Sequence, residues 1–128
     1  QVAGANQAAW ALFAAHVTSR LMPLFVIRTL PHVGDTAQSK SKPLAETIST
    51  AGLLAGLAWW AAAMALAGWM APGMSWLHAV MGALVGLAWM WRLLQRRLQG
   101  FTGDGLGATQ QMAEIGFLLG VALAANSA

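Results

Sequence analysis

Charge is scarce in this sequence: Asp, Glu, Lys and Arg together make up only 9% of its 128 residues. A water-soluble domain carries about 25% charged residues, because its outer surface has to be hydrated. Hydrophobic residues account for 58% of the chain, and the mean hydropathy is +0.58. The shortage of charge therefore excludes an ordinary soluble domain and indicates an outer surface that faces lipid.

Cysteine is absent altogether, which excludes disulfide bonds and thiolate chemistry. The chain also lacks the motifs of zinc sites, phosphate-binding P-loops, dinucleotide-binding turns and serine-hydrolase nucleophile elbows. Its net charge is +3, but the basic residues form two short clusters between apolar stretches instead of one continuous basic surface. That pattern is typical of membrane proteins, so no nucleic-acid partner is expected.

Long uncharged stretches predict the helices. Residues 47–91 contain no Asp, Glu, Lys or Arg, whereas about 20 residues suffice to cross a bilayer. Pro72 and Gly73 break this stretch and favour a tight reversal between two helices. Pro23 lies inside the first apolar stretch and predicts a kink there. We therefore predict an all-α integral membrane bundle of four transmembrane helices, near residues 5–30, 46–70, 76–98 and 105–124.

Basic residues mark one side of this bundle. Six of the seven Lys and Arg residues lie in or beside the connections that follow the first and third helices: Arg28, Lys40, Lys42, Arg92, Arg96 and Arg97. These two connections share a side in an up-and-down bundle, and positive charge is enriched in cytoplasmic loops. We predict that both connections face the cytoplasm and that the turn at 71–75 faces outward.

Three of the predicted helices carry glycines four residues apart: Gly52/Gly56, Gly82/Gly86 and Gly116/Gly120. Small residues at this spacing let helix backbones approach closely in lipid. A chain with 14 glycines also produces such spacings by chance, so that alternative stays open.

Two charged residues fall deep inside predicted helices. Glu114 lies about 15 Å deeper than Asp104 at the helical rise, near the middle of the bilayer. Arg20 lies about 12 Å deeper than Arg28, and His16 is one turn away on the same face. A carboxylate at this depth requires a partner, protonation or a wet cavity. We predict an Arg20–Glu114 pair, which either fixes helix packing or takes part in a site.

A glycine-rich turn precedes the last helix, in the stretch Gly100-Phe101-Thr102-Gly103-Asp104-Gly105-Leu106-Gly107-Ala108. Backbone N–H groups at such a helix start bind anions, and an Asp placed there is suited to hold Mg²⁺ against a phosphate. The alternative is that Thr102 or Asp104 only caps the helix. Lys40 and Lys42 are candidates for phosphate contacts, or they are only the topology signal.

The same stretch, extended back to Arg97 and followed by Glu114, resembles the C-terminal signature of cobalamin synthases, the adenosylcobinamide-GDP ribazoletransferases. The resemblance covers essentially the whole chain. Further segments similar to that family are Ser19-Arg20, Arg28-Thr29-Leu30-Pro31 and Ser39-Lys40-Ser41-Lys42-Pro43. Gln99 departs from the pattern, because the family usually has Gly at this position.

The resemblance implies a phosphotransferase of the bacterial inner membrane that acts in the last steps of cobalamin biosynthesis. It would join adenosylcobinamide-GDP to α-ribazole or its 5′-phosphate and release GMP, with Mg²⁺ as the cofactor. Asp104 would bind the metal ion and act in catalysis together with Arg20 and Glu114. The substrate-binding residues would be Arg28, Lys40, Lys42, Thr102, Gly103 and Gly107.

One departure from the family is large. Its members carry an upstream acidic segment with paired aspartates, thought to bind the catalytic metal, whereas Asp35 and Asp104 are the only aspartates here. We therefore expect residues 1–128 to form a single transmembrane unit, the C-terminal part of a longer enzyme whose N-terminal half is its partner. A small permease or channel subunit and a non-catalytic membrane anchor are the alternatives. The lower-ligand base and a homo-oligomeric state are left open.

Overall fold

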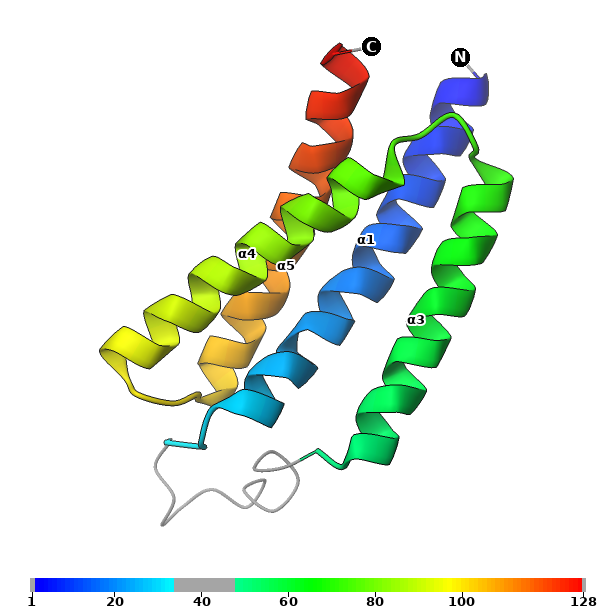
Figure 1. Cartoon of the computed structure of the whole chain (residues 1–128). Helices are drawn as coiled ribbons and strands as arrows, with labels where there is room; N and C mark the ends of the chain where they lie inside the picture. The colour runs from blue at the N-terminus through cyan, green and yellow to red at the C-terminus, as the bar shows by residue number, and fades with distance from the viewer. Residues whose placement is uncertain (1, 34–47, 128) are drawn as a thin grey trace.

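The computed structural model describes residues 2–33 and 48–127. Over these residues the chain forms four α-helices, which are α1 (Val2–Thr29), α3 (Thr50–Met70), α4 (Trp76–Arg97) and α5 (Gly103–Ser127) (Figure 1). Each is long and apolar enough to cross a membrane. The predicted all-α membrane bundle is confirmed, and every predicted helix boundary lies within four residues of the observed one.

The helices run alternately up and down (Figure 1). The two termini and the α3–α4 turn lie at one end of the bundle, while α3 and α5 start at the other end, where α1 and α4 finish. Arg28 lies in the last turn of α1, and Arg96 and Arg97 lie in the last turn of α4. We call this second end the basic end. That it faces the cytoplasm stays a prediction.

Helices α4 and α5 pack backbone against backbone. A Cβ atom added to Gly82 would lie 2.0 Å from the carbonyl oxygen of Gly116, and one added to Gly86 would lie 2.5 Å from that of Met112. A Cβ atom on Gly120 would lie 2.2 Å from another α4 carbonyl oxygen. Any side chain at these positions would push the helices apart, so two of the three predicted glycine pairs are confirmed as close contacts.

Helix α3 packs on α1 more loosely. Only Ala67 of α3 is buried, and a Cβ atom on Gly56 would meet a leucine side chain at 3.1 Å instead of a backbone. The third glycine pair, to which Gly56 belongs, therefore marks no backbone contact. Thr18 joins the two helices within the apolar layer: the indole Nε1 of Trp60 donates to its Oγ1 at 3.0 Å, and this Oγ1 donates to Sδ of Met64 at 3.8 Å. The bond from Trp60 accounts for a tryptophan in the middle of a transmembrane helix.

Helix α1 packs against all three other helices and continues unbroken through Pro23, so the predicted kink does not interrupt it. Its buried face is formed by Ala11, Ala14, Ala15, Thr18, Ser19, Leu21, Met22 and Val26. The opposite face, which carries Leu12, His16 and Arg20 one turn apart, is exposed. We call it the open face of α1.

Candidate functional site

The connection between α4 and α5 is a tight turn held by the segment that follows α1. The N–H of Phe101 donates to the carbonyl oxygen of Pro31 at 2.9 Å, and the N–H of Val33 donates to that of Phe101 at 2.9 Å. A Cβ atom on Gly100 would lie 2.3 Å from the Pro31 carbonyl oxygen, so the close approach requires glycine. The buried ring of Phe101 packs edge-on against His32, with ring centroids 5.3 Å apart. The turn is thereby fixed to the end of α1.

Gln99, within this turn, adopts a left-handed backbone conformation with a φ of 57°. That conformation costs a residue with a side chain about 1–2 kcal/mol. Gln99 is also the residue that departs from the usual Gly of the family pattern. The turn therefore forms despite the departure, with backbone strain at one residue.

Thr102 is the N-cap of α5. Its Oγ1 accepts a hydrogen bond from the N–H of Gly105 at 3.0 Å, and its carbonyl oxygen accepts one from the N–H of Leu106 at 2.9 Å. Of the two capping candidates, the cap is therefore Thr102 and not Asp104. The cap does not use the N–H groups of Gly103 and Asp104, which are two further donors at the helix start.

Asp104 is exposed in the first turn of α5. Among the described residues, no side chain forms a hydrogen bond or an ion pair with its carboxylate. A Cβ atom on Gly103 or Gly107 would meet nothing within 4 Å, so these glycines border Asp104 on an open surface and packing does not require them. The helix dipole favours an anion at this position.

The site fits a magnesium ion in part. Within residues 2–33 and 48–127, no three His, Asp or Glu side chains gather to hold a metal ion. Mg²⁺ is commonly bound by one or two carboxylates together with substrate phosphates and waters. Asp104 would therefore serve as one protein ligand from the described chain, with phosphate oxygens as the other ligands.

Glu114 pairs with His16 and not with Arg20. The Nδ1 atom of His16 lies 3.1 Å from Oε1 of Glu114, and the two side chains are 60% and 18% exposed. Both residues lie near the midpoints of their antiparallel helices, so they meet at the same depth. Arg20 is one turn nearer the basic end and is turned toward α3, where it lines a groove with Trp59 and Trp60. The predicted Arg20–Glu114 pair is therefore not formed, because Glu114 lies at the depth of His16, one turn away from Arg20, and Arg20 leaves α1 on the side of α3.

A polar stripe follows α5 from the helix start to the contact between His16 and Glu114. Its residues recur at intervals of three and four and so share one face of the helix: Asp104, Gly107, Gln111 and Glu114. The stripe extends about 15 Å, from the basic end to the middle of the helix. Gln111, which is exposed, was missed by the sequence analysis, although its spacing from Asp104 and Glu114 was the available signal.

Arg28 has a structural task that sequence analysis did not foresee. Its guanidinium donates to the carbonyl oxygen of Ile48 at 2.9 Å and to Oγ1 of Thr50 at 2.8 Å. These bonds tie the end of α1 to the start of α3, and a phosphate would have to compete with them. The candidates for phosphate contacts, Lys40 and Lys42, lie outside the described residues.

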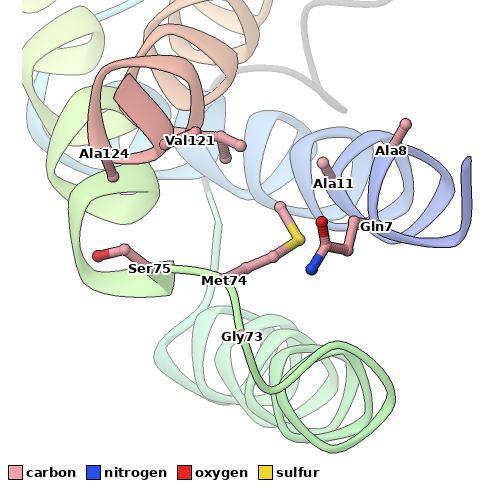
Figure 2. A pocket seen from close by; sticks show the side chains of 9 residues that line it. Gln7, Ala8, Ala11, Gly73, Met74, Ser75, Val121 and Ala124 are labelled. Carbon is pink, nitrogen blue, oxygen red and sulfur yellow. The ribbon is translucent and has the colours of Figure 1, made fainter. Parts of the chain in front are cut away.

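A separate cavity of about 260 Å³ lies at the end opposite to Asp104, between α1, α5 and the α3–α4 turn (Figure 2). Its lining is mostly small and apolar, and consists of Gln7, Ala8, Ala11, Gly73, Met74, Ser75, Val121, Ala124 and Ala125. The polar stripe of α5 ends at mid-helix and does not reach this cavity. It is therefore a different feature from the candidate site.

Comparison with known proteins gives one consistent match. The family model described as cobalamin-5-phosphate synthase matches residues 1–122. An adenosylcobinamide-GDP ribazoletransferase of Polaromonas sp. (strain JS666 / ATCC BAA-500) is 53% identical over 113 residues, which are 88% of this chain and 40% of the relative. Proteins of the same name from Albidiferax ferrireducens and Vibrio cholerae are 50% and 37% identical, over 88% and 79% of this chain and 45% and 37% of the relatives. The chain spans about two-fifths of the length of these curated relatives. No solved structure matches it.

Proposed function

The chain belongs to the cobalamin-5-phosphate synthase family, and we propose that it forms one wall of the active site of a membrane phosphotransferase. The reaction proposed joins adenosylcobinamide-GDP to α-ribazole or α-ribazole 5′-phosphate. Because the chain spans about two-fifths of its relatives' length, we assign the reaction to the complete family protein. The permease and anchor alternatives are not favoured, because the relatives described above carry a transferase name.

The proposal rests on one observation: no side chain of the described residues forms a hydrogen bond or an ion pair with the carboxylate of Asp104. Thr102 caps α5, so the carboxylate of Asp104 is not needed for that purpose, and it is exposed beside two glycines that leave the surface open. The N–H groups of Gly103 and Asp104 point out of the helix start, as do those of other helix starts that bind phosphate. These features support the proposal that Asp104 holds Mg²⁺ while the helix start holds a phosphate oxygen.

The reaction would proceed as a displacement at phosphorus. The hydroxyl oxygen of the ribazole attacks the phosphorus bonded to the cobinamide arm, a new P–O bond forms, and the bond to GMP breaks. The hydroxyl proton is lost to a base, and GMP leaves with the electron pair of the broken bond. Mg²⁺, when bound, would neutralise charge on the diphosphate. The contribution of this chain is to fix the diphosphate at the start of α5.

The basic residues indicate the side of the membrane on which the proposed site lies. The helix start with Asp104 lies at the basic end, as do Arg96 and Arg97 of α4. By the positive-inside bias, this end lies on the cytoplasmic side of a bacterial inner membrane. The charged GDP moiety of the substrate is soluble in water on that side. The basic residues would then raise the local concentration of anionic substrates.

The test is GMP release by a full-length chimera. In it, the 113 matched residues of the Polaromonas protein are replaced by the corresponding residues of this chain, and adenosylcobinamide-GDP is supplied with α-ribazole or with its 5′-phosphate. GMP release comparable to that of the Polaromonas protein is expected with at least one acceptor. A chimera that is membrane-inserted and monodisperse, yet releases no GMP with either acceptor, would contradict the proposal.

A further inference from the structure

The open face of α1 places polar groups where the bilayer is most apolar. His16 is the central residue of this face and lies near the midpoint of α1 (Val2–Thr29), and its partner Glu114 lies near the midpoint of α5 (Gly103–Ser127). The His16 side chain is 60% exposed. A polar or ionisable group facing hydrocarbon at the bilayer centre costs several kcal/mol, so such groups normally face other protein segments or water.

The positive charge of Arg20 lies next to the pair of His16 and Glu114. Arg20 is exposed one turn nearer the basic end, and among the described residues no carboxylate lies within 4.0 Å of it. The Cα atom of Arg20 lies about 6 Å along α1 from that of His16, and the side chain can extend the guanidinium part of the way to the interface. An anionic partner on the same side of α1 would offset the cost of placing this charge in hydrocarbon, and the Arg20 side chain would not have to extend to the interface.

The face of α5 that adjoins the open face of α1 is also unfilled. A Cβ atom on Gly107 would meet no atom within 4 Å, and Gln111 is exposed between Gly107 and Glu114. Helix α4 packs on the glycine face of α5. Helix α3 borders only the edge of the open face, where Arg20 lines a groove with Trp59 and Trp60, so His16 and Leu12 stay exposed. Small and polar residues that run together along two helices are typical of a helix–helix contact in membranes.

We propose that the open face of α1, together with the mid-helix part of the polar stripe around Gln111 and Glu114, is the surface on which a further transmembrane helix of the complete family protein packs. Asp104 and the start of α5 lie beyond this contact and stay open. The matched region is only 40% of the Polaromonas protein, so that protein has the length to supply such a helix. The facing side of this helix is polar and carries a carboxylate opposite Arg20. A second copy of this chain is a poorer occupant, because a two-fold contact along this face would bring Arg20 toward its own counterpart. The inference concerns packing and does not depend on the reaction proposed above.

The test measures which residues touch lipid. The chain contains no cysteine, so a single spin label reports on one position. Leu12→Cys places the label on the open face of α1, where Leu12 is 53% exposed, and Val85→Cys is the matched control on the outer face of α4, where Val85 is 66% exposed. Each variant is made in two proteins, the 128-residue chain and the full-length chimera on a cysteine-free background, and both are placed in bilayers. The oxygen accessibility of the label is measured from its collisions with dissolved oxygen.

At position 12, oxygen accessibility should fall several-fold from the isolated chain to the chimera, while that of position 85 should be equal in both. Equal, high accessibility of both positions in both proteins would overturn the proposal. Protection of position 12 in the isolated chain, with a dimeric mass, would also overturn it and would assign the face to a second copy. If the chimera does not fold, the same two labels are placed at the aligned positions of the Polaromonas protein, where protection at the first position alone is again the expected result.

Discussion

His16 and Glu114 meet at the midpoints of α1 and α5, with Nδ1 of His16 3.1 Å from Oε1 of Glu114. Within an apolar layer, each side chain supplies the polar partner that the other would otherwise lack. A polar group left without its partner is more costly than the absence of both groups. The two residues should therefore behave as a unit.

A double-mutant cycle tests that unit. Glu114→Leu should destabilise the chain by about 1–3 kcal/mol, because it leaves His16 without a partner. The double variant with His16→Leu should recover part of this loss, and Glu114→Gln, which keeps a hydrogen-bonding group, should cost less than Glu114→Leu. Free energies of unfolding in a fixed detergent or bilayer give the coupling energy. Strictly additive effects of the two leucine substitutions would show that the contact contributes nothing.

Asp104 and Thr102 should differ in what they affect. Thr102→Ala removes the cap of α5 and should cost about 1 kcal/mol of stability. Asp104→Asn removes only a favourable interaction with the helix dipole, about 0.3–1 kcal/mol, yet it should lower GMP release of the chimera by orders of magnitude if the carboxylate binds Mg²⁺. Melting temperature and turnover are measured for both variants. Near-normal turnover of Asp104→Asn would remove this residue from the chemistry.

Glycines of α5 should respond oppositely according to their neighbours. A Cβ atom on Gly116 would lie 2.2 Å from the carbonyl oxygen of Gly82, so Gly116→Ala should destabilise the chain by about 1–3 kcal/mol through overpacking. Gly107→Ala meets no atom within 4 Å and should stabilise the helix by about 0.5–1 kcal/mol. Thermal unfolding in the same detergent compares the two. Equal effects would mean that α4 and α5 do not pack through their backbones.

The strain at Gln99 can be relieved. Gln99 holds a φ of 57°, a conformation that glycine adopts without the steric cost paid by other residues. Gln99→Gly should therefore raise the stability by up to about 1 kcal/mol. Gln95→Gly, which lies within the regular helix α4, is the control and should lower the stability by about 1 kcal/mol. Destabilisation by both substitutions would argue against the left-handed turn.

The orientation of the bundle can be tested with single cysteines in this cysteine-free chain. Gln95→Cys lies near the basic end and Asn126→Cys near the opposite end, and both positions are exposed. If the positive-inside bias applies, an impermeant thiol reagent added to intact cells should label only the cysteine at position 126. Labelling of position 95 instead would reverse the proposed topology.

The helices were predictable because their signals are local. The uncharged residues 47–91 and the break at Pro72 and Gly73 located α3 and α4, since hydrocarbon tolerates few charges and helix ends need turn residues. The glycine spacing also identified the α4–α5 contact, but it could not show that the pair of Gly52 and Gly56 lies on a loosely packed helix. Whether a glycine pair makes a backbone contact depends on which helix packs against it, and the spacing alone does not specify that helix.

The candidate site was predictable only in part, for the same reason. Helical rise gave the depth of Glu114 correctly, but the direction in which Arg20 leaves α1 depends on how α1 is turned between α3 and α5. Sequence analysis could not fix that rotation, so it chose Arg20 over His16. It also left open whether Thr102 or Asp104 is the cap, because both residue types commonly cap helices and only the hydrogen bond of Gly105 decides between them.

The cavity at the end opposite to Asp104 has a consequence for the surrounding bilayer. Gln7, in its lining, lies about 13 Å from the midpoint of α1, and the hydrocarbon core extends about 15 Å from its centre. The cavity therefore opens at the level where acyl chains meet the glycerol and phosphate groups of the lipids. A small molecule that enters the cavity there competes with lipid segments and interfacial water, and the displacement of ordered water lowers its affinity.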